Sequence, residues 1–176
     1  MVLTPDGNEM YWSAYIGDEE TPSILCVKKV RGQWTKPQLF SKGDVPFISP
    51  DGNKFYFIGL KQVQGADKKI IYVRDKTTSG WSEPHELSDA INSLPRIHWQ
   101  LSVDKKGNLY FGARSSGTRS SGIYCAEFRD GEFREPQAIE SLKDSGAHSP
   151  YIAPDGSYLL ISKEGEGISV LFRRSD

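Results

Sequence analysis

The sequence has few of the residues and motifs that commonly indicate a function. Its 176 residues include two cysteines, Cys26 and Cys125, and it contains no paired-cysteine zinc pattern, phosphate-binding loop, HExxH metal motif or Gly-x-Ser-x-Gly elbow. No apolar run approaches about 18 residues, so the sequence predicts no membrane-spanning helix. The 22 basic and 23 acidic residues give a formal net charge of −1. This balance excludes a chain-wide field that would attract nucleic acid or a membrane.

Two short phrases recur along the chain. The first joins a tight turn to an apolar stretch, and it reads TPDGNEMYW from Thr4, SPDGNKFYF from Ser49, VDKKGNLYF from Val103 and APDGSYLLI from Ala153. Its turn glycines are 45, 55 and 49 residues apart. The second phrase alternates with the first, and it reads GQWTKPQLF from Gly32, GWSEPHELS from Gly80 and GEFREPQAI from Gly131. A repeat of about this length with no helical pattern is typical of a four-stranded blade, so the sequence predicts a β-propeller.

Each repeat divides into four stretches of strand length. In the second repeat a Pro-Asp-Gly turn is followed by NKFYFIGL, which is rich in aromatic and β-branched residues. A proline in a central strand would remove a ladder hydrogen bond, so the proline of the second phrase indicates an outer strand. In the third turn, which has an extra residue, we expect Lys105 or Lys106 to replace the proline–aspartate pair. The predicted strands include Asn53–Gly59, Lys69–Arg74, Asn108–Gly112 and Tyr158–Ser162.

The alternation of a Pro-Asp-Gly turn with a Trp-x-x-Pro strand resembles the TolB-like β-propeller family, with its WD40-like repeats. The resemblance covers essentially the whole chain. It implies an all-β propeller of four-stranded antiparallel blades, and it suggests a periplasmic or other extracytoplasmic location. It does not select one function, because propellers of this kind include scaffolds, transport partners, lyases and peptidase gating domains.

The repeats predict a single propeller domain or segment with blades at approximately 1–43, 44–94, 95–145 and 146–176. The first repeat has almost no first strand, and the last stops where a fourth strand should begin. We therefore expect a part of a larger propeller, with a compact four-bladed ring as the alternative. Incomplete end blades would leave apolar flanks and unpaired strand edges, which favours a homodimer that covers them.

The cysteines stand at equivalent positions, eight residues before Trp34 and Phe133. Equivalent positions two blades apart are farther from one another than a disulfide allows. We therefore expect Cys26 and Cys125 to be small, buried, reduced side chains.

A first candidate site lies at the start of the first strand of each repeat. His98 and His148 occupy equivalent positions in repeats three and four, and Asp44 occupies this position in repeat two. Equivalent first-strand positions form a ring around a propeller channel, so these side chains could converge near one mouth. Two histidines and a carboxylate can bind a divalent metal or act as acid and base. The alternative is that each residue caps a loop or bonds the next blade.

A second candidate ring follows the second strand. Arg114 and Lys163 occupy matching positions, where repeats two and one have Leu60 and Tyr15. A guanidinium beside the serines and glycines of the loop ARSSGTRSSG can hold a carboxylate, such as an acidic sugar or a peptide terminus. A solvated loop with no ligand is the alternative.

From these patterns we expect a non-catalytic binding module that presents its channel-mouth loops to a protein or a small polar ligand. The ligand-binding candidates are Asp44, His98, His148, Arg114 and Lys163. We expect no cofactor, no nucleic-acid partner and no membrane insertion. The alternative is a carbohydrate-active enzyme, a lyase or glycosidase acting on acidic sugars, because some members of the resembled family are lyases with metal-binding histidines near the channel.

Overall fold

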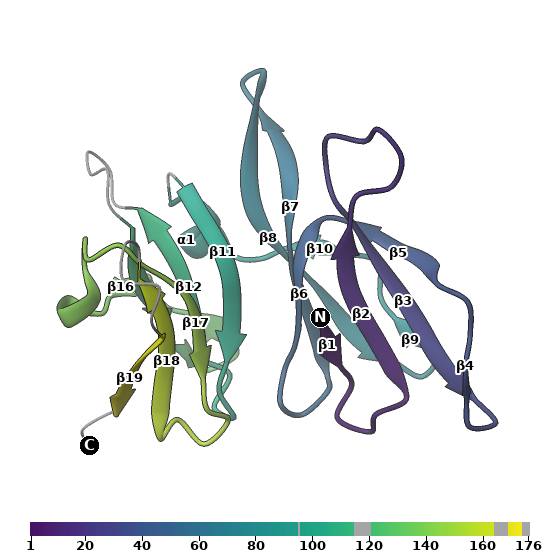
Figure 1. The fold of residues 1–176 in the computed structure, drawn as a ribbon. Coiled ribbons are helices and arrows are strands. Elements are labelled where there is room, and N and C mark those ends of the chain that lie inside the picture. Colours follow the sequence, from purple (N-terminus) through teal and green to yellow (C-terminus); the bar gives the residue numbers. More distant parts are fainter. Residues whose placement is uncertain (95, 115–120, 164–168, 174–176) are drawn as a thin grey trace. The chain divides into compact units, whose positions relative to one another are not determined.

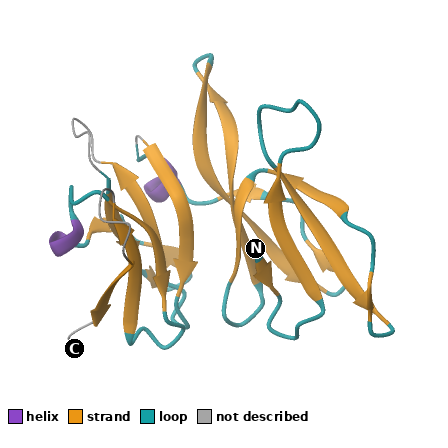
Figure 2. Cartoon of the chain, viewed as in Figure 1, coloured by secondary structure: helices purple, strands orange, loops and turns teal. Residues whose placement is uncertain are grey.

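The structure, a computed structural model, describes residues 1–94, 96–114, 121–163 and 169–173. For residues 96, 98, 99 and 169–173 it describes the backbone but not the side chain. The described chain is nearly all-β (Figure 2). The helices of its described part are α1 (Asp89–Asn92) and a 3-10 turn at Glu140–Leu142. None of them has the length and hydrophobicity that a membrane span requires. The chain separates into two compact units, Met1–His85 (unit 1) and Glu86–Asp176 (unit 2).

Unit 1 contains two antiparallel sheets (Figure 1). In the first sheet β1 pairs with β2, β2 with β3, and β3 with both β4 and β5. In the second sheet the order is β10-β8-β7-β6, and β9 also pairs with β8. The strands of the first sheet are β1 (Val2–Leu3), β2 (Glu9–Ala14), β3 (Ser23–Val30), β4 (Gln33–Trp34) and β5 (Gln38–Lys42). Those of the second are β6 (Asp44–Ile48), β7 (Lys54–Val63), β8 (Ala66–Thr77), β9 (Gly80–Trp81) and β10 (His85–Glu86).

Unit 2 repeats this plan. Its four-stranded sheet has the order β11-β12-β13-β16, its three-stranded sheet has the order β17-β18-β19, and β14 and β15 form a separate hairpin. The strands of the four-stranded sheet are β11 (Arg96–Val103), β12 (Leu109–Arg114), β13 (Gly122–Ala126) and β16 (Gln137–Ala138). The others are β14 (Phe128–Arg129), β15 (Glu132–Phe133), β17 (Ala147–Ile152), β18 (Tyr158–Lys163) and β19 (Ser169–Arg173).

The predicted fold class is confirmed, since each repeat folds as an antiparallel sheet. The four predicted strands correspond to β7, β8, β12 and β18. The proline of each second phrase stands directly before the outer strand (β5, β10 or β16), so the missing N–H lies outside the central ladder. The prediction that all four blades form one domain stays a prediction.

The recurring turns are built in the same way. The turn glycines have φ between 69 and 87°, a left-handed conformation that glycine adopts without strain. Asp51 accepts hydrogen bonds from the backbone and side-chain nitrogens of Asn53, at 3.0 and 2.9 Å. The expectation for the third turn was wrong. Asp104, and neither lysine, takes the place of the aspartate, because it accepts two hydrogen bonds from Asn108 at 3.0 and 2.9 Å.

These turn carboxylates make the stability of the fold depend on pH. Hydrogen bonds from Thr4 and Asn8 lower the pKa of Asp6 to about 2. Hydrogen bonds from Ser157 lower the pKa of Asp155 as well. A carboxyl with a depressed folded-state pKa stabilises the fold above its unfolded-state pKa of about 4, and this stabilisation is lost as the pH falls through the folded value.

We therefore expect the free energy of unfolding to fall between about pH 4 and pH 2. The Asp6→Asn variant should show a smaller fall over this interval than the wild type, because it lacks one of the titrating groups. Urea denaturation at a series of pH values measures both. The control is Asp18→Asn, at an exposed carboxyl, which should follow the wild type. An Asp6→Asn curve parallel to the wild-type curve would contradict the assignment.

The core of unit 1 is an aromatic cluster between its two sheets. Phe55 is fully buried, and its ring lies 4.8 Å from Tyr11, 4.8 Å from Phe40 and 5.5 Å from Trp81. The indole N–H of Trp81 donates to the Tyr11 hydroxyl at 2.9 Å, and this hydroxyl donates to Glu9 at 2.7 Å. Burial, and then the Glu9 carboxylate, raise the pKa of Tyr11. The second-phrase tryptophan of repeat two therefore packs one blade on the next.

The cysteine positions agree only in part with their prediction. Both cysteines are free thiols. Cys26 is buried in the core of unit 1, where burial raises the pKa of its thiol. Cys125 is partly exposed and packs against the core cluster of unit 2. The second cysteine is therefore less buried than we expected, because β13 pairs only with the two-residue strand β16 on its outer side.

Candidate functional site

Three first strands carry the same irregularity at the first candidate ring. Asp44 pairs with Ile58, and the register then shifts before the next pair. The same shift follows His98, which pairs with Gly112, and His148. Each bulge contains a non-glycine residue with positive φ: Val45 at 55°, Gln100 at 59° and Ser149 at 53°. The backbones of the three candidate residues therefore occupy equivalent positions, each directly before a β-bulge.

The three candidate residues do not all belong to the same unit. Asp44 is partly buried in unit 1. His148 is partly buried in unit 2, and its Nδ1 lies 3.1 Å from the Ser149 hydroxyl. The His98 side chain lies outside the described residues. Within the described part of the chain, no group of three or more His, Cys, Asp or Glu side chains could hold a metal ion. The convergence of the three residues stays a prediction.

The second candidate ring also divides between the units. Arg114 and Lys163 are partly buried at the ends of β12 and β18 in unit 2. Their equivalents in repeats one and two, Tyr15 and Leu60, lie together in unit 1, where both line one pocket. The positions that the repeats single out thus mark a cavity in the first two blades.

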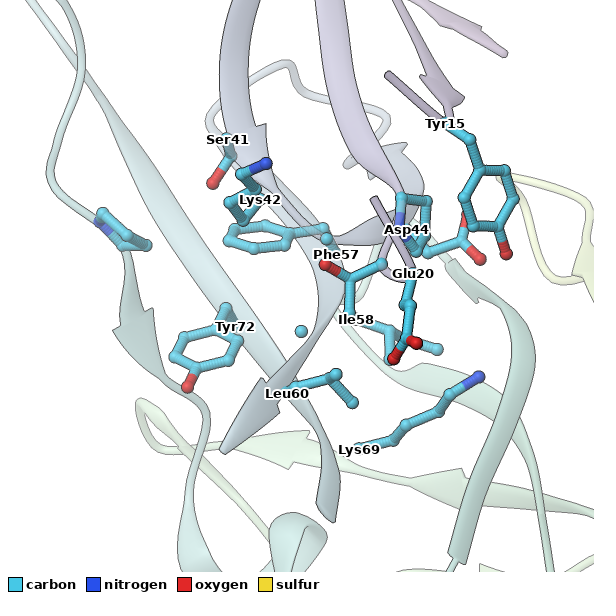
Figure 3. Close-up of a pocket in the computed structure, with 15 residues that line it drawn as sticks. Tyr15, Glu20, Ser41, Lys42, Asp44, Phe57, Ile58, Leu60, Lys69 and Tyr72 are labelled. Atoms are coloured by element: carbon cyan, nitrogen blue, oxygen red, sulfur yellow. The ribbon is translucent and has the colours of Figure 1, made fainter. Parts of the chain in front are cut away.

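The unit 1 pocket has a volume of about 430 Å³ (Figure 3). This lies within the range of about 300–1,000 Å³ for small-molecule sites. Four segments form it: the β2–β3 loop, the β5–β6 junction, the outer part of the β7–β8 hairpin, and Pro84. In Figure 1 this hairpin runs well beyond the end of β6. The labelled lining residues are Tyr15, Glu20, Ser41, Lys42, Asp44, Phe57, Ile58, Leu60, Lys69 and Tyr72.

Two glycines allow the aromatic part of the pocket to form. The rings of Phe57 and Tyr72 stack at 5.5 Å with an angle of 18°. A Cβ on Gly59 would meet the Tyr72 ring at 2.8 Å. A Cβ on Gly43 would meet the Phe57 ring and the Ile58 carbonyl oxygen, each at 2.7 Å. Side chains at either glycine would therefore displace the stacked pair.

Charged groups of both signs line the same pocket. Lys42 forms an ion pair with Glu19, outside the lining. Within the described residues, Glu20, Asp44 and Lys69 have no ion-pair partner. Figure 3 shows Glu20 and Lys69 on the side of the pocket opposite Tyr72. Two carboxylates and an ammonium group are therefore available to a bound polar molecule.

The bulge fixes the backbone beside Asp44. The N–H of Val45 donates to Asp44 Oδ1 at 2.7 Å and to the Ser13 hydroxyl, on the neighbouring sheet, at 3.1 Å. Val45 is β-branched, and a positive φ is a strained conformation for such a residue. A strained backbone conformation persists only where the surrounding structure holds it in place, and such conformations are concentrated at functional sites. The second carboxylate oxygen of Asp44 has no hydrogen-bond donor among the described residues.

Several pocket residues could not be identified from the sequence. Glu20 lies in a loop, and Lys69 and Tyr72 lie on a strand whose hairpin is longer than those of the other repeats. None of them belongs to either recurring phrase. The sequence predicted only that Lys69 and Tyr72 lie on a strand, because KKIIYVRD is the third strand-length stretch of its repeat.

The paired antiparallel blades define a propeller-type fold, and unit 1 contains a pocket in it. No protein-family model matches the chain, and no curated protein matches its sequence. Solved structures do match its fold. Hydrazine synthase of Kuenenia stuttgartiensis has a TM-score of 0.61 at 12% identity over 98% of this chain and 57% of that chain. The periplasmic gluconolactonase PpgL of Pseudomonas aeruginosa has a TM-score of 0.55 at 15% identity over 94% of this chain and 49% of that chain.

A protein of Bacteroides uniformis, provisionally assigned as a 6-phosphogluconolactonase, has a TM-score of 0.55 at 16% identity over 99% of this chain and 50% of that chain. The chain thus spans about half the length of the structures it matches. At these identities the matches show a propeller fold, and they do not distinguish the TolB-like subgroup.

The comparisons correct the functional expectation. The non-catalytic binding module was the first interpretation of the sequence, but the matched structures are described as enzymes, among them lactonases of sugar acids. They agree better with the alternative, a carbohydrate-active enzyme. The sequence pointed the other way because no catalytic motif recurs in its repeats.

Proposed function

We propose that the chain belongs to a carbohydrate-active enzyme of the lactonase type, which hydrolyses the internal ester of a sugar acid. The observation that carries this proposal is the strained bulge that holds the Asp44 carboxylate at the wall of a sugar-sized pocket. The fold similarity to a gluconolactonase supports the same reaction class.

The lining groups suit this substrate. The Phe57–Tyr72 pair offers apolar ring surface, and the serine, threonine and carboxylate oxygens of the lining can bind hydroxyl groups. Pockets that bind polar ligands combine such an apolar wall with a few placed polar groups. A sugar lactone, which has apolar C–H faces and a rim of hydroxyls, matches both parts.

The proposed reaction uses three groups. The free oxygen of Asp44 takes a proton from water, and the hydroxide equivalent attacks the lactone carbonyl carbon. The Lys69 ammonium stabilises the negative charge that develops on the carbonyl oxygen. When the ring C–O bond breaks, the leaving oxygen takes that same proton from Asp44, directly or relayed through Glu20, so both carboxylates end the reaction ionised. Lactone and water thus give one hydroxy acid, with no other reactant.

Two further features belong to the proposal. A periplasmic location fits the periplasmic gluconolactonase among the matches. Membership of the TolB-like subgroup rests on the recurring turn and Trp-x-x-Pro phrases alone. The homodimer expected from the end blades stays a prediction.

The test is a lactonase assay with glucono-δ-lactone and its 6-phosphate, followed by acid release and corrected for spontaneous hydrolysis. We expect saturable hydrolysis of at least one lactone. The Asp44→Asn variant should lower kcat by about 100-fold or more, the range for loss of a general base. Thermal unfolding of the variant should show that the fold is retained.

Asp18→Asn provides the matched control, because Asp18 is an exposed carboxyl outside the pocket lining. This variant should keep wild-type kcat. The proposal fails if no lactone is hydrolysed faster than in buffer, or if a folded Asp44→Asn variant is as active as the wild type.

A further inference from the structure

A second feature lies in unit 2, at the neck of the β12–β13 hairpin. The last pair of this ladder joins Ala113 to Gly122. Arg114 is the last residue of β12 and Ser121 directly precedes β13, so the same register places them opposite one another. Residues opposite one another on antiparallel strands project their side chains to the same face of the sheet. Their polar groups can therefore act on one ligand.

Both side chains hold a buried donor with no partner. Within the described residues, Arg114 Nε and Ser121 Oγ are buried and make no hydrogen bond. Ser121 is 4% exposed. Buried polar groups are almost always hydrogen-bonded, because an unmet donor costs about 1–3 kcal/mol. Two unmet donors on one face are therefore an unusual arrangement.

Arg74 in unit 1 shows how an arginine is satisfied without a ligand. Its Nε also lacks a partner. However, its terminal nitrogens donate to the carbonyl oxygens of Ser82 and Phe40 at 3.0 and 3.4 Å, and its guanidinium lies 4.7 Å from the centre of the Phe40 ring. Arg114 has no such acceptor among the described residues.

The backbone around this neck is fixed. The Gly146 N–H donates to the Ser121 carbonyl at 3.0 Å. A Cβ on Gly122 would meet the Leu142 carbonyl oxygen at 2.9 Å, so the segment after β16 lies directly against the neck. On the other side, the backbone of Arg96 pairs with Arg114. No acidic side chain among the described residues pairs with Arg114.

We propose that Arg114 and Ser121 form a binding site for a small oxyanion, a carboxylate or a phosphate. The Nε–H and one terminal N–H of a guanidinium can bind two oxygens of such a group side by side. The Ser121 hydroxyl then donates to one of these oxygens. This site is distinct from the unit 1 pocket, and it does not depend on the proposed function.

Calorimetric titration with inorganic phosphate and, separately, with acetate tests the site at constant ionic strength. We expect saturable binding of at least one anion. Comparing the two titrations shows whether the site prefers a phosphate or a carboxylate. Arg114→Lys keeps the charge but loses the paired N–H groups, and we expect about a 10-fold or greater loss of affinity. Ser121→Ala should weaken binding in the same direction.

Urea denaturation without added anion gives a second readout. Ser121→Ala removes an unpaired buried hydroxyl, so its unfolding midpoint should be no lower than that of the wild type. Arg134→Lys is the control for an arginine-to-lysine change outside the site, because Arg134 pairs with Asp130 at an exposed position. This variant should bind anions like the wild type. The proposal is overturned if neither anion binds saturably, if Arg114→Lys binds like the wild type, or if Ser121→Ala is destabilised.

Discussion

Replacing Phe55 by alanine should destabilise unit 1 by about 3–5 kcal/mol, which is the usual cost of removing a large aromatic side chain from a core. Phe55 is 0% exposed. Its ring contacts aromatic side chains from both sheets of the unit, at centroid distances of 4.8–6.2 Å. Two of these neighbours, Tyr11 and Trp81, are held by their own hydrogen bond, which opposes their movement into the cavity. The loss should therefore include most of the cavity cost.

Urea denaturation followed by circular dichroism and tryptophan fluorescence measures this effect. Trp81 is a suitable reporter, since its ring lies 5.5 Å from that of Phe55. Leu39→Ala is the control, because Leu39 is 58% exposed and its removal should change stability by no more than about 0.5 kcal/mol. A Phe55→Ala variant within about 1 kcal/mol of the wild type would show that this cluster does not hold the sheets together.

The turns and the sheet order could be predicted because they depend on local chemistry. Asp51 and Gly52 form their turn through hydrogen bonds within the phrase itself, so a short phrase suffices to identify it. The recurrence of that phrase then indicates the number of repeats. The third turn misled the prediction, since Asp104 lies four residues before its partner Asn108 instead of two.

Tertiary surroundings could not be read from the same phrases. Trp34 and Trp81 occupy the same position of the second phrase. Trp34 is nevertheless 43% exposed, while Trp81 is partly buried and packs against the core of unit 1. Trp81 has Tyr11, from the neighbouring sheet, as a hydrogen-bond partner. The difference lies in which strand comes next to each tryptophan, and no local pattern reports this.

The candidate site was predictable only where the repeats agree. Asp44 was identified because the same slot recurs, and its backbone position before a bulge matches those of His98 and His148. The strained conformation of Val45 was not predictable, because β-branched residues normally avoid positive φ. Glu20 and Lys69 belong to segments that are peculiar to one repeat, so internal comparison could not find them.

Replacing Gly43 by alanine should remove the pocket of unit 1 and cost about 2–4 kcal/mol of stability, from overpacking together with backbone strain. Gly43 has φ of 140°, and its added Cβ would lie 2.7 Å from the Ile58 carbonyl oxygen. This oxygen belongs to the ladder of β7, so it cannot move away as the end of a flexible side chain could. The β5–β6 junction must shift instead, and Asp44, the next residue, shifts with it.

Measurements of stability and of activity on a second variant, Gly65→Ala, separate the effect of backbone strain from that of the steric collision. Gly65→Ala introduces a side chain at a φ of 80° with no atom within 4 Å of the new Cβ, so it carries the strain without the collision. We expect it to cost about 1 kcal/mol and to leave the proposed lactone hydrolysis unchanged. Gly43→Ala should lower both the unfolding midpoint and the rate of the proposed hydrolysis. If the two variants are equally stable and equally active, the collision beside Asp44 has no consequence and Gly43 does not shape the site.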